Sequence, residues 1–441
     1  MSIKYNNPFI NIPEIEYKSQ NEIKEFQEQL LKKHLAYLDQ NSDFYNKYFI
    51  KHSINIDEIT TLEDLEKIPP VSKHDLQTHN QRFICIPEDK IVDFITTTGT
   101  SGDPVTFITT EKDLDRLAYN EGISFLGAGI GHHDIIQLTV TLDKRFMAGL
   151  AYFLGARQIG AGVVRVGSGI PELQWDTVRR IKSTVLIGVP SFILKLIDYA
   201  KKNGIDYKNS TIKKAICIGE PIRKSNFKLN TLGEKISEKW DIELFSTYAS
   251  TEMSSAFTEC IAGQGGHLHP DLLIVEFLDE KNRPVEEGTP GEVTVTTLGV
   301  EGMPLLRFKT GDICNRITEP CSCGRNTLRI GPVIGRKDQM IKYKGTTLYP
   351  PAFYEVLDDI KEVENYIVEA TTNQIGTDDI NVKLGCTNFT AGLEKMIKDH
   401  FRARLRVAPQ IEFLHPKEIT KLQFLKGSRK AIKFKDQRVK V

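Results

Sequence analysis

The chain has 441 residues, 40% of them hydrophobic, and its 58 Lys and Arg are balanced by 58 Asp and Glu. This length exceeds one ordinary core, so we expect two domains. The formal net charge of zero excludes a general attraction to nucleic acid or anionic membranes, and no apolar run is long enough to span a bilayer. Residues 1–11 lack an apolar signal sequence and the seven cysteines are an odd, scattered set, which favours a cytoplasmic protein with reduced thiols or a bound metal.

Helical and strand patterns alternate along the chain. Apolar residues recur at helical spacing over 21–38, and Pro190 favours the start of another helix. We expect strands at 184–189, 215–218, 242–245 and 291–297, with 411–414 as the last strand. Segment 291–297 alternates like a half-exposed strand. The order predicts an α/β fold with a mixed or parallel sheet covered by helices, whose ligands bind beyond the carboxyl ends of the strands.

A domain boundary is expected near Gly335, which divides the chain into residues 1–334 and 335–441. The second part has 20 Lys and Arg against 14 Asp and Glu, a net charge of +6, so the first part carries −6. An ordinary small domain with an uneven charge split explains this. A basic lid that closes over phosphates explains it equally well.

The first candidate binding segment follows the apolar pair Phe94-Ile95. It combines hydroxyls with glycines in the run Thr97, Thr98, Gly99, Thr100, Ser101 and Gly102. Glycines let the backbone approach a phosphate, and amides and hydroxyls donate to its oxygens. The alternative is a flexible linker.

Three further segments, in chain order, contain candidate binding residues. Glu252 ends the run Tyr248, Ala249, Ser250, Thr251, directly after an expected strand, and could hold Mg²⁺ or be a solvated loop residue. Asp312 could accept from ribose hydroxyls or sit in a simple Gly-Asp turn. The basic segments follow at Arg336, Lys342 and the tail around Lys430, where a solvated charge run is the alternative.

In this order the motifs resemble the adenylate-forming superfamily, most closely its phenylacetate–coenzyme A ligase branch, over nearly the whole chain. The resemblance implies a large N-terminal domain of mixed sheets and helices, a small mobile α+β C-terminal domain and an active site between them. It implies ATP, Mg²⁺, a carboxylic acid and coenzyme A as ligands.

The resemblance also implies residue roles. The 97–102 loop would grip the ATP β- and γ-phosphates, Thr251 would lie near the α-phosphate, Glu252 would hold Mg²⁺ and Lys430 would serve adenylation. The remaining expected contacts are adenine at Gly219, Glu220, Pro221 and Tyr248, ribose at Asp312 with Arg336 beside it, a hinge at Asp338, and the pantetheine tunnel at Gly345.

Two departures from the superfamily pattern matter. Many members end the first loop in Pro-Lys, whereas Val105 follows Pro104 here, which removes one expected phosphate contact. The terminal motif usually has glycine before its lysine, whereas Arg429 precedes Lys430, so Lys426 competes for the role.

A metal site is the second hypothesis. Cys321 and Cys323 form a C-x-C segment, and Cys260, His267 and His269 lie upstream. Three thiolates and one imidazole would complete a tetrahedral Zn²⁺ site, with either histidine as the nitrogen ligand. The alternative is a set of reduced cysteines, because C-x-C is less specific than paired C-x-x-C.

The sequence therefore predicts an ATP-dependent acid–thiol ligase, with an aryl acid as an inference from the resemblance. The expected lining of the acyl pocket is Phe146, Tyr152, Val189-Pro190 and Tyr248, and the alternative is that Phe146 and Tyr152 belong to the core. Competing functions are adenylyl transfer to another acceptor, as in coenzyme F390 synthetases, loading of a carrier-protein thiol, and a non-catalytic adenylate-binding protein. Neither nucleic acid nor membrane is an expected partner, and a homodimer is an open alternative.

Overall fold

A computed structural model of the chain describes residues 10–97, 104–344, 346–373, 378–388, 390–424 and 431–438. It divides into two compact units. The first is 1–310 with 314–332, and the second is 311–313 with 333–441. The domain boundary expected from the sequence stays a prediction. No helix in the described part of the chain is both long and apolar enough to cross a bilayer.

The first unit begins with a helical segment. Helix α1 starts at a capping box, in which Ser19 N donates to the Glu22 carboxylate at 2.9 Å and Glu22 N donates to Ser19 Oγ at 3.3 Å. The apolar stripe predicted for 21–38 is buried along this helix. The first elements are α1 (Gln20–Asn41), α2 (Asp43–Lys51), α3 (Lys73–His79), and the hairpin β1 (Asp93–Thr96) and β2 (Thr106–Thr109).

A six-stranded sheet forms the centre of this unit, with strand order β4-β3-β5-β6-β7-β8. All neighbours are parallel except β7 and β8. Its elements are α4 (Glu111–Gly127), β3 (Ile135–Leu138), α5 (Met147–Gln158), β4 (Gly162–Arg165), α6 (Pro171–Ile181), β5 (Val185–Gly188), α7 (Pro190–Lys202), β6 (Lys214–Cys217), α8 (Thr231–Lys239), β7 (Glu243–Ser250) and β8 (Ser255–Thr258).

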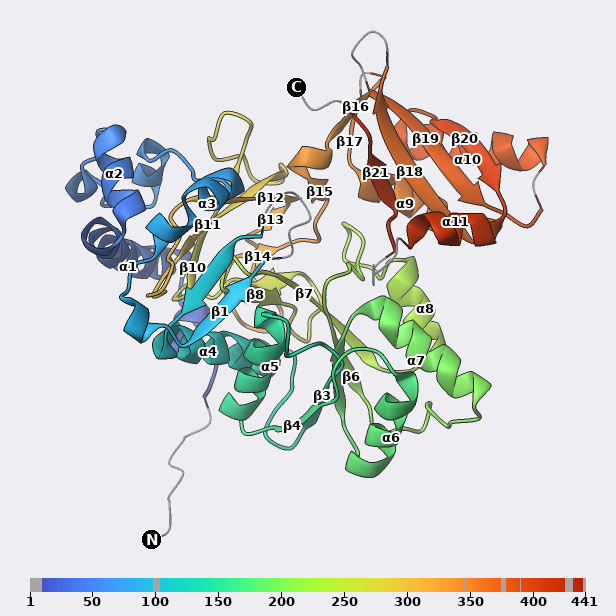
Figure 1. The fold of residues 1–441 in the computed structure, drawn as a ribbon, viewed down its shortest axis with the longest axis horizontal. Helices are drawn as coiled ribbons and strands as arrows, with labels where there is room; N and C mark the ends of the chain where they lie inside the picture. The colour runs from blue at the N-terminus through green and yellow to red at the C-terminus, as the bar shows by residue number, and fades with distance from the viewer. Residues whose placement is uncertain are drawn as a thin grey trace. The chain divides into compact units, whose positions relative to one another are not determined.

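Helices cover both faces of this sheet (Figure 1). Leu186, Ala215 and Leu244 face the core formed with α6, α7 and α8. Their neighbours Ile187 and Ile216 face the opposite core, formed with α4 and α5. Successive side chains along each strand thus pack alternately into two separate cores, as a sheet buried on both faces requires. The predicted strands at 184–189 and 215–218 and the helix starting at Pro190 are confirmed.

The rest of the first unit is antiparallel. Its strands are β9 (Gly266–His267), β10 (Leu273–Leu278), β11 (Gly291–Thr297), β12 (Phe308–Cys314, of which residues 311–313 belong to the second unit), β13 (Arg316–Ile317) and β14 (Arg329–Ile330). The prediction that 291–297 is half exposed is wrong, because every residue of β11 is buried. β11 lies between β10 and β12. Its threonine hydroxyls are satisfied internally; Thr296 Oγ1, for example, accepts from Arg307 N at 3.0 Å.

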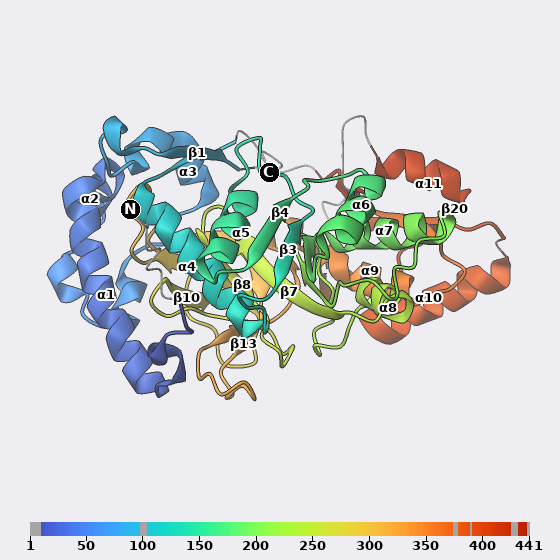
Figure 2. The ribbon, with the colours of Figure 1, turned by 90° about the horizontal axis from the view of Figure 1, so that it is seen from below.

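The second unit is a small α+β body around one core (Figure 2). Its elements are β15 (Gly335–Arg336), β16 (Ile341–Tyr343), β17 (Thr346–Leu348), α9 (Pro350–Asp358), β18 (Asn365–Thr372), β19 (Asp378–Gly385), α10 (Ala391–Leu405), β20 (Gln410–Leu414), α11 (Pro416–Gln423) and β21 (Phe434–Asp436). Four strands form a sheet in the order β20-β19-β18-β21. The expectation that 411–414 is the last strand is wrong, since β21 follows it and pairs in parallel with β18.

Candidate active site and metal centre

The Thr/Ser/Gly segment joins strands β1 and β2 of the first hairpin. Thr97 closes its base, because its amide donates to Val105 O and its hydroxyl accepts from Val105 N, both at 3.0 Å. The five following predicted residues, Thr98, Gly99, Thr100, Ser101 and Gly102, lie outside the described residues. Their role toward phosphate stays a prediction.

The Gly219-Glu220-Pro221 turn follows the carboxyl end of β6. Gly219 has φ +72°, a conformation that a side chain would strain. The Glu220 carboxylate accepts from both the amide and the hydroxyl of Ser191, each at 2.9 Å. Since Ser191 is in the first turn of α7, Glu220 ties together the loops that follow β5 and β6. This is the edge of the sheet at which ligands bind in such folds.

Strand β7 runs further than the sequence predicts. Tyr248, Ala249 and Ser250 belong to the strand, whereas a loop was expected directly after residue 245. The reason is the antiparallel partner β8, because the register pairs Tyr248 with Phe257 and Ser250 with Ser255. Thr251 and Glu252 therefore occupy the turn of a hairpin at the end of the sheet.

The carboxylate of Glu252 faces a lysine that sequence reasoning missed. Lys73 Nζ lies 3.9 Å from Glu252 Oε1, and the side chains are 32% and 12% exposed. Lys73 is the first residue of α3, whose start is set by the Ser72–Asp75 capping box. A single lysine at the start of a polar helix has no sequence pattern, so only the fold reveals this pair. The pair brings a carboxylate suited to Mg²⁺ and a cation suited to phosphate oxygens together.

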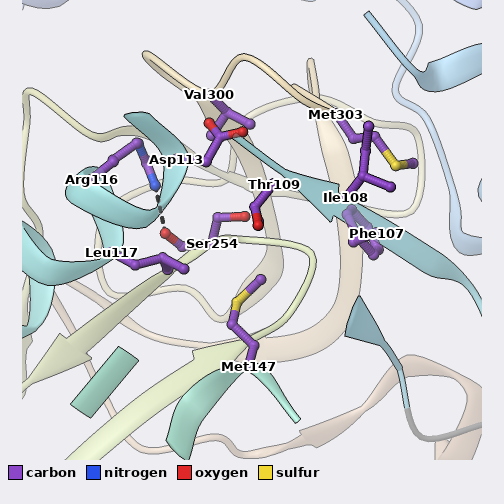
Figure 3. Close-up of a pocket in the computed structure, with 10 residues that line it drawn as sticks. All are labelled: Phe107, Ile108, Thr109, Asp113, Arg116, Leu117, Met147, Ser254, Val300 and Met303. Atoms are coloured by element: carbon purple, nitrogen blue, oxygen red, sulfur yellow. Dashed lines mark hydrogen bonds between the residues drawn. The ribbon is translucent and has the colours of Figure 1, made fainter. Parts of the chain in front are cut away.

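A pocket lies behind this turn (Figure 3). It is lined by Phe107, Ile108, Thr109, Asp113, Arg116, Leu117, Met147, Ser254, Val300 and Met303. The Thr109 hydroxyl has no hydrogen-bond partner among the described residues. Of the predicted acyl-pocket residues, Tyr152 is 2% exposed and packs in the core, so the core interpretation is correct for it. Phe146 immediately precedes α5, whose first residue, Met147, reaches the pocket.

In the second unit, Asp312 and Arg336 are direct cross-strand partners on β12 and β15. Arg336 Nε lies 3.2 Å from Asp312 Oδ1, and Asp312 sits in a strand rather than in the simple turn considered as the alternative. Lys342 is on β16, and its amide donates to Asp378 at 2.7 Å. Gly345, Lys426 and Lys430 lie outside the described residues.

The four predicted metal ligands form a cluster in the first unit. The ligand atoms of Cys260, His267, Cys321 and Cys323 all lie within 4.8 Å of one another. Cys260 Sγ is 3.6 Å from Cys321 Sγ, and Cys323 Sγ is 3.6 Å from His267 Nε2. These four side chains converge from two segments, 260–267 and 321–323, that lie far apart in sequence. Three thiols and one imidazole are the donor set of a tetrahedral structural zinc site, so the residues fit this ion.

Hydrogen bonding separates the two candidate histidines. His267 Nδ1 lies 2.8 Å from Thr327 Oγ1, which leaves Nε2 facing the thiols. His269 uses both nitrogens elsewhere, with Nδ1 at 2.6 Å from Glu16 and Nε2 at 3.3 Å from Ser124 Oγ. Burial lowers the pKa of His267 to about 2, so its ring is neutral, as a metal ligand must be. The geometry favours His267 over His269.

The cluster is tied to the N-terminal segment by buried charges. Glu16, in the short 3-10 helix Glu14–Tyr17, accepts from Arg325 Nη1 at 3.0 Å and is 0% exposed. Burial opposes ionisation of Cys323, but hydrogen bonds and the charge from Arg325 lower its pKa overall. Burial raises the pKa of Cys260 to about 12. Sequence reasoning missed Glu16 and Arg325, because 309 residues separate them.

Comparison with known proteins identifies the family. The AMP-binding enzyme family matches residues 30–301. The chain belongs to this family. It is 28% identical to a phenylacetate–coenzyme A ligase from Thermus thermophilus over 356 residues, which are 80% of this chain and 78% of that one. A phenylacetate–coenzyme A ligase from Aromatoleum evansii is 27% identical over 84% of this chain and 83% of its own length. The predicted branch of the adenylate-forming superfamily is thereby confirmed.

Solved structures confirm the predicted fold class. A 2-hydroxyisobutyryl-CoA ligase crystallised in the postadenylation state with R3-HIB-AMP superposes with a TM-score of 0.83, at 22% identity, over 96% of this chain and 92% of that one. An anthranilate CoA ligase in complex with anthranoyl-AMP gives a TM-score of 0.56 at 17% identity, over 74% of this chain and 63% of that one. At this identity the likeness supports the fold alone.

Proposed function

We propose that this AMP-binding enzyme is an acid–coenzyme A ligase that converts a carboxylic acid, ATP and coenzyme A to acyl-CoA, AMP and pyrophosphate. The observation that carries the proposal is the Glu252–Lys73 pair, which lies inside the matched region 30–301. The phenylacetate–coenzyme A ligases among its relatives support coenzyme A as the acceptor. Its seven cysteines form no disulfide among the described residues, which suits the reducing cytoplasm.

In the first half-reaction, a carboxylate oxygen attacks the α-phosphorus of ATP and pyrophosphate leaves. Both reactants are anions, so the site must neutralise charge that grows on the phosphate oxygens. Glu252 would hold Mg²⁺, which when bound stabilises charge on those oxygens. Lys73 would donate to the same phosphates and thereby replace the lysine that is absent after Pro104. Thr251 would lie near the α-phosphate, and Lys430 would serve adenylation.

In the second half-reaction, the thiol of coenzyme A attacks the acyl carbon and AMP leaves. The segment around Gly345 would line the route of the thiol, and Asp312 and Arg336 would hold the ribose. A hinge at Asp338 would exchange the states that serve the two steps. Adenylation needs a lysine at the phosphates, whereas thioester formation needs an open path for the thiol. An aryl acid is the proposed substrate class, because relatives of this chain are named phenylacetate–coenzyme A ligases.

We also propose that Cys260, His267, Cys321 and Cys323 hold one Zn²⁺. The site would be structural, because four protein ligands leave no position for substrate. It would hold the 3-10 helix at Glu16 against the Cys321–Cys323 segment through Arg325.

The test of the proposed function is ATP–pyrophosphate exchange on Glu252→Gln. Removal of transition-state charge stabilisation of this kind lowers rates by about 10²-fold or more. We expect that loss at an unchanged melting temperature. Exchange at the wild-type rate would refute the role of Glu252. Product analysis with and without coenzyme A separates thioester formation from adenylyl transfer to another acceptor.

A further inference from the structure

The turn that carries Glu252 contains a strained residue. Ser254 has φ +49°, a left-handed conformation that costs a non-glycine residue about 1 kcal/mol or more. Local contacts are long: Ser254 N donates to Thr251 O at 3.2 Å, and Met253 N donates to Ser250 Oγ at 3.3 Å. A tertiary contact must therefore help to hold this conformation.

Arg116 supplies that contact from α4. In its guanidinium, Nη1 donates to Ser254 O at 2.5 Å, Nε donates to Leu298 O at 2.8 Å and Nη2 donates to Leu272 O at 2.6 Å. Figure 3 shows Arg116 beside Asp113, with its bond to Ser254. One turn later on α4, Asn120 Oδ1 accepts from Ala256 N at 2.9 Å. Helix α4 thus holds the chain on the C-terminal side of Glu252 through two side chains, Arg116 and Asn120.

A buried cation in this position lowers the stability of the fold, so its presence suggests that the geometry of its hydrogen bonds is needed. Arg116 is 8% exposed, and no carboxylate in the described chain forms an ion pair with it. Asp113, three residues earlier on the same helix, accepts the amides of Glu301 and Gly302 at 2.8 and 2.9 Å. Burial lowers the pKa of Arg116 to about 10, so it stays charged at neutral pH. Lysine could not replace it, because only a planar fork reaches three carbonyls from three segments.

From these contacts we infer that Arg116 is a positioning residue for Glu252. It holds the left-handed turn at Ser254, and through it sets the carboxylate of Glu252 relative to Lys73. This inference rests on the proposed function, because it takes Glu252 as the magnesium ligand. Arg116 itself makes no contact with substrate in this role.

The experiment is a magnesium titration of ATP–pyrophosphate exchange on Arg116→Lys. Displacing a catalytic group by about 1 Å can lower a rate by about 10²-fold. We expect an exchange rate lowered tenfold to a hundredfold and a half-activating Mg²⁺ concentration raised about tenfold. Arg116→Gln, which removes the buried charge together with the fork, should behave in the same way and serves if the lysine variant does not fold.

Arg329→Lys is the matched control. Arg329 is 5% exposed and donates to two carbonyls, Gln264 O at 2.6 Å and Glu319 O at 2.8 Å, in the region of the Cys/His cluster. It should lower the melting temperature and leave the Mg²⁺ dependence unchanged. A further variant, Ser254→Gly in the Arg116→Lys background, should recover part of the exchange rate, because glycine adopts positive φ without strain.

The outcomes distinguish this inference from the proposed function. If the wild-type chain exchanges pyrophosphate and both Arg116 variants lower only the melting temperature, with an unchanged Mg²⁺ dependence, Arg116 is merely structural and the inference is wrong. If Glu252→Gln keeps the wild-type rate, the proposed function loses its magnesium ligand and the inference fails with it.

Discussion

A buried acid on α4 gives the sharpest stability prediction. Glu121 is 5% exposed, and no hydrogen bond or ion pair from the described residues reaches its carboxyl group. It packs where α4 meets α5, so closely that a Cβ on Gly155 would lie 2.4 Å from the Glu121 Cβ. Burial raises the pKa of Glu121 from 4.5 to about 8. The folded protein therefore keeps this carboxyl protonated at neutral pH.

The consequence is a pH-dependent loss of stability. Between the unfolded pKa of 4.5 and the folded pKa of about 8, the folded state binds more protons than the unfolded state, so stability falls as the pH rises. At about 1.4 kcal/mol per pKa unit, the loss is about 3 kcal/mol at pH 7 and approaches about 5 kcal/mol above pH 8.

Glu121→Gln should remove this slope while keeping the side-chain shape. We expect urea unfolding at pH 5, 6, 7 and 8 to show a variant that gains about 1 kcal/mol per pH unit relative to the wild type. Glu111→Gln, at the exposed start of the same helix, is the matched control and should leave the slope unchanged. Parallel wild-type and Glu121→Gln curves would refute the reasoning.

Three further predictions concern the site. The purified chain should contain about one zinc per molecule and lose it on Cys321→Ser but not on Cys217→Ser, as measured by metal analysis; a fully folded, zinc-free wild type would contradict the site. Lys73→Gln should lower pyrophosphate exchange at least tenfold at an unchanged melting temperature, whereas an unchanged rate removes Lys73 from the phosphates. Lys430→Ala should lose exchange yet still convert supplied acyl-adenylate with coenzyme A, and Gly345→Trp should do the reverse; equal loss of both half-reactions argues against alternation.

The sequence predicted features that depend on local patterning. The stripe of α1, the apolar runs of β5 and β6 and the proline at the start of α7 each specify their element within a few residues. The Cys321-x-Cys323 segment likewise predicted a cluster of thiols, and the structure brings these two cysteines together with Cys260 and His267.

Features that arise from distant partners could not be predicted. The extension of β7 through Ser250 depends on pairing with β8, and the full burial of β11 depends on its flanking strands. Strand β21 is short and rich in charge, so it has no apolar run to reveal it. Lys73 and Arg116 are single basic residues whose partners lie more than a hundred residues away, so only the fold reveals their contacts with Glu252 and Ser254.

The most direct test of the account is ATP–pyrophosphate exchange by the wild-type chain with a panel of carboxylic acids, followed by product analysis with coenzyme A. The account predicts exchange that depends on the acid and is fastest with an aryl acid, and complete conversion to acyl-CoA and AMP when coenzyme A is added. Exchange with none of the acids, or an acyl-adenylate that coenzyme A leaves unchanged, would contradict it.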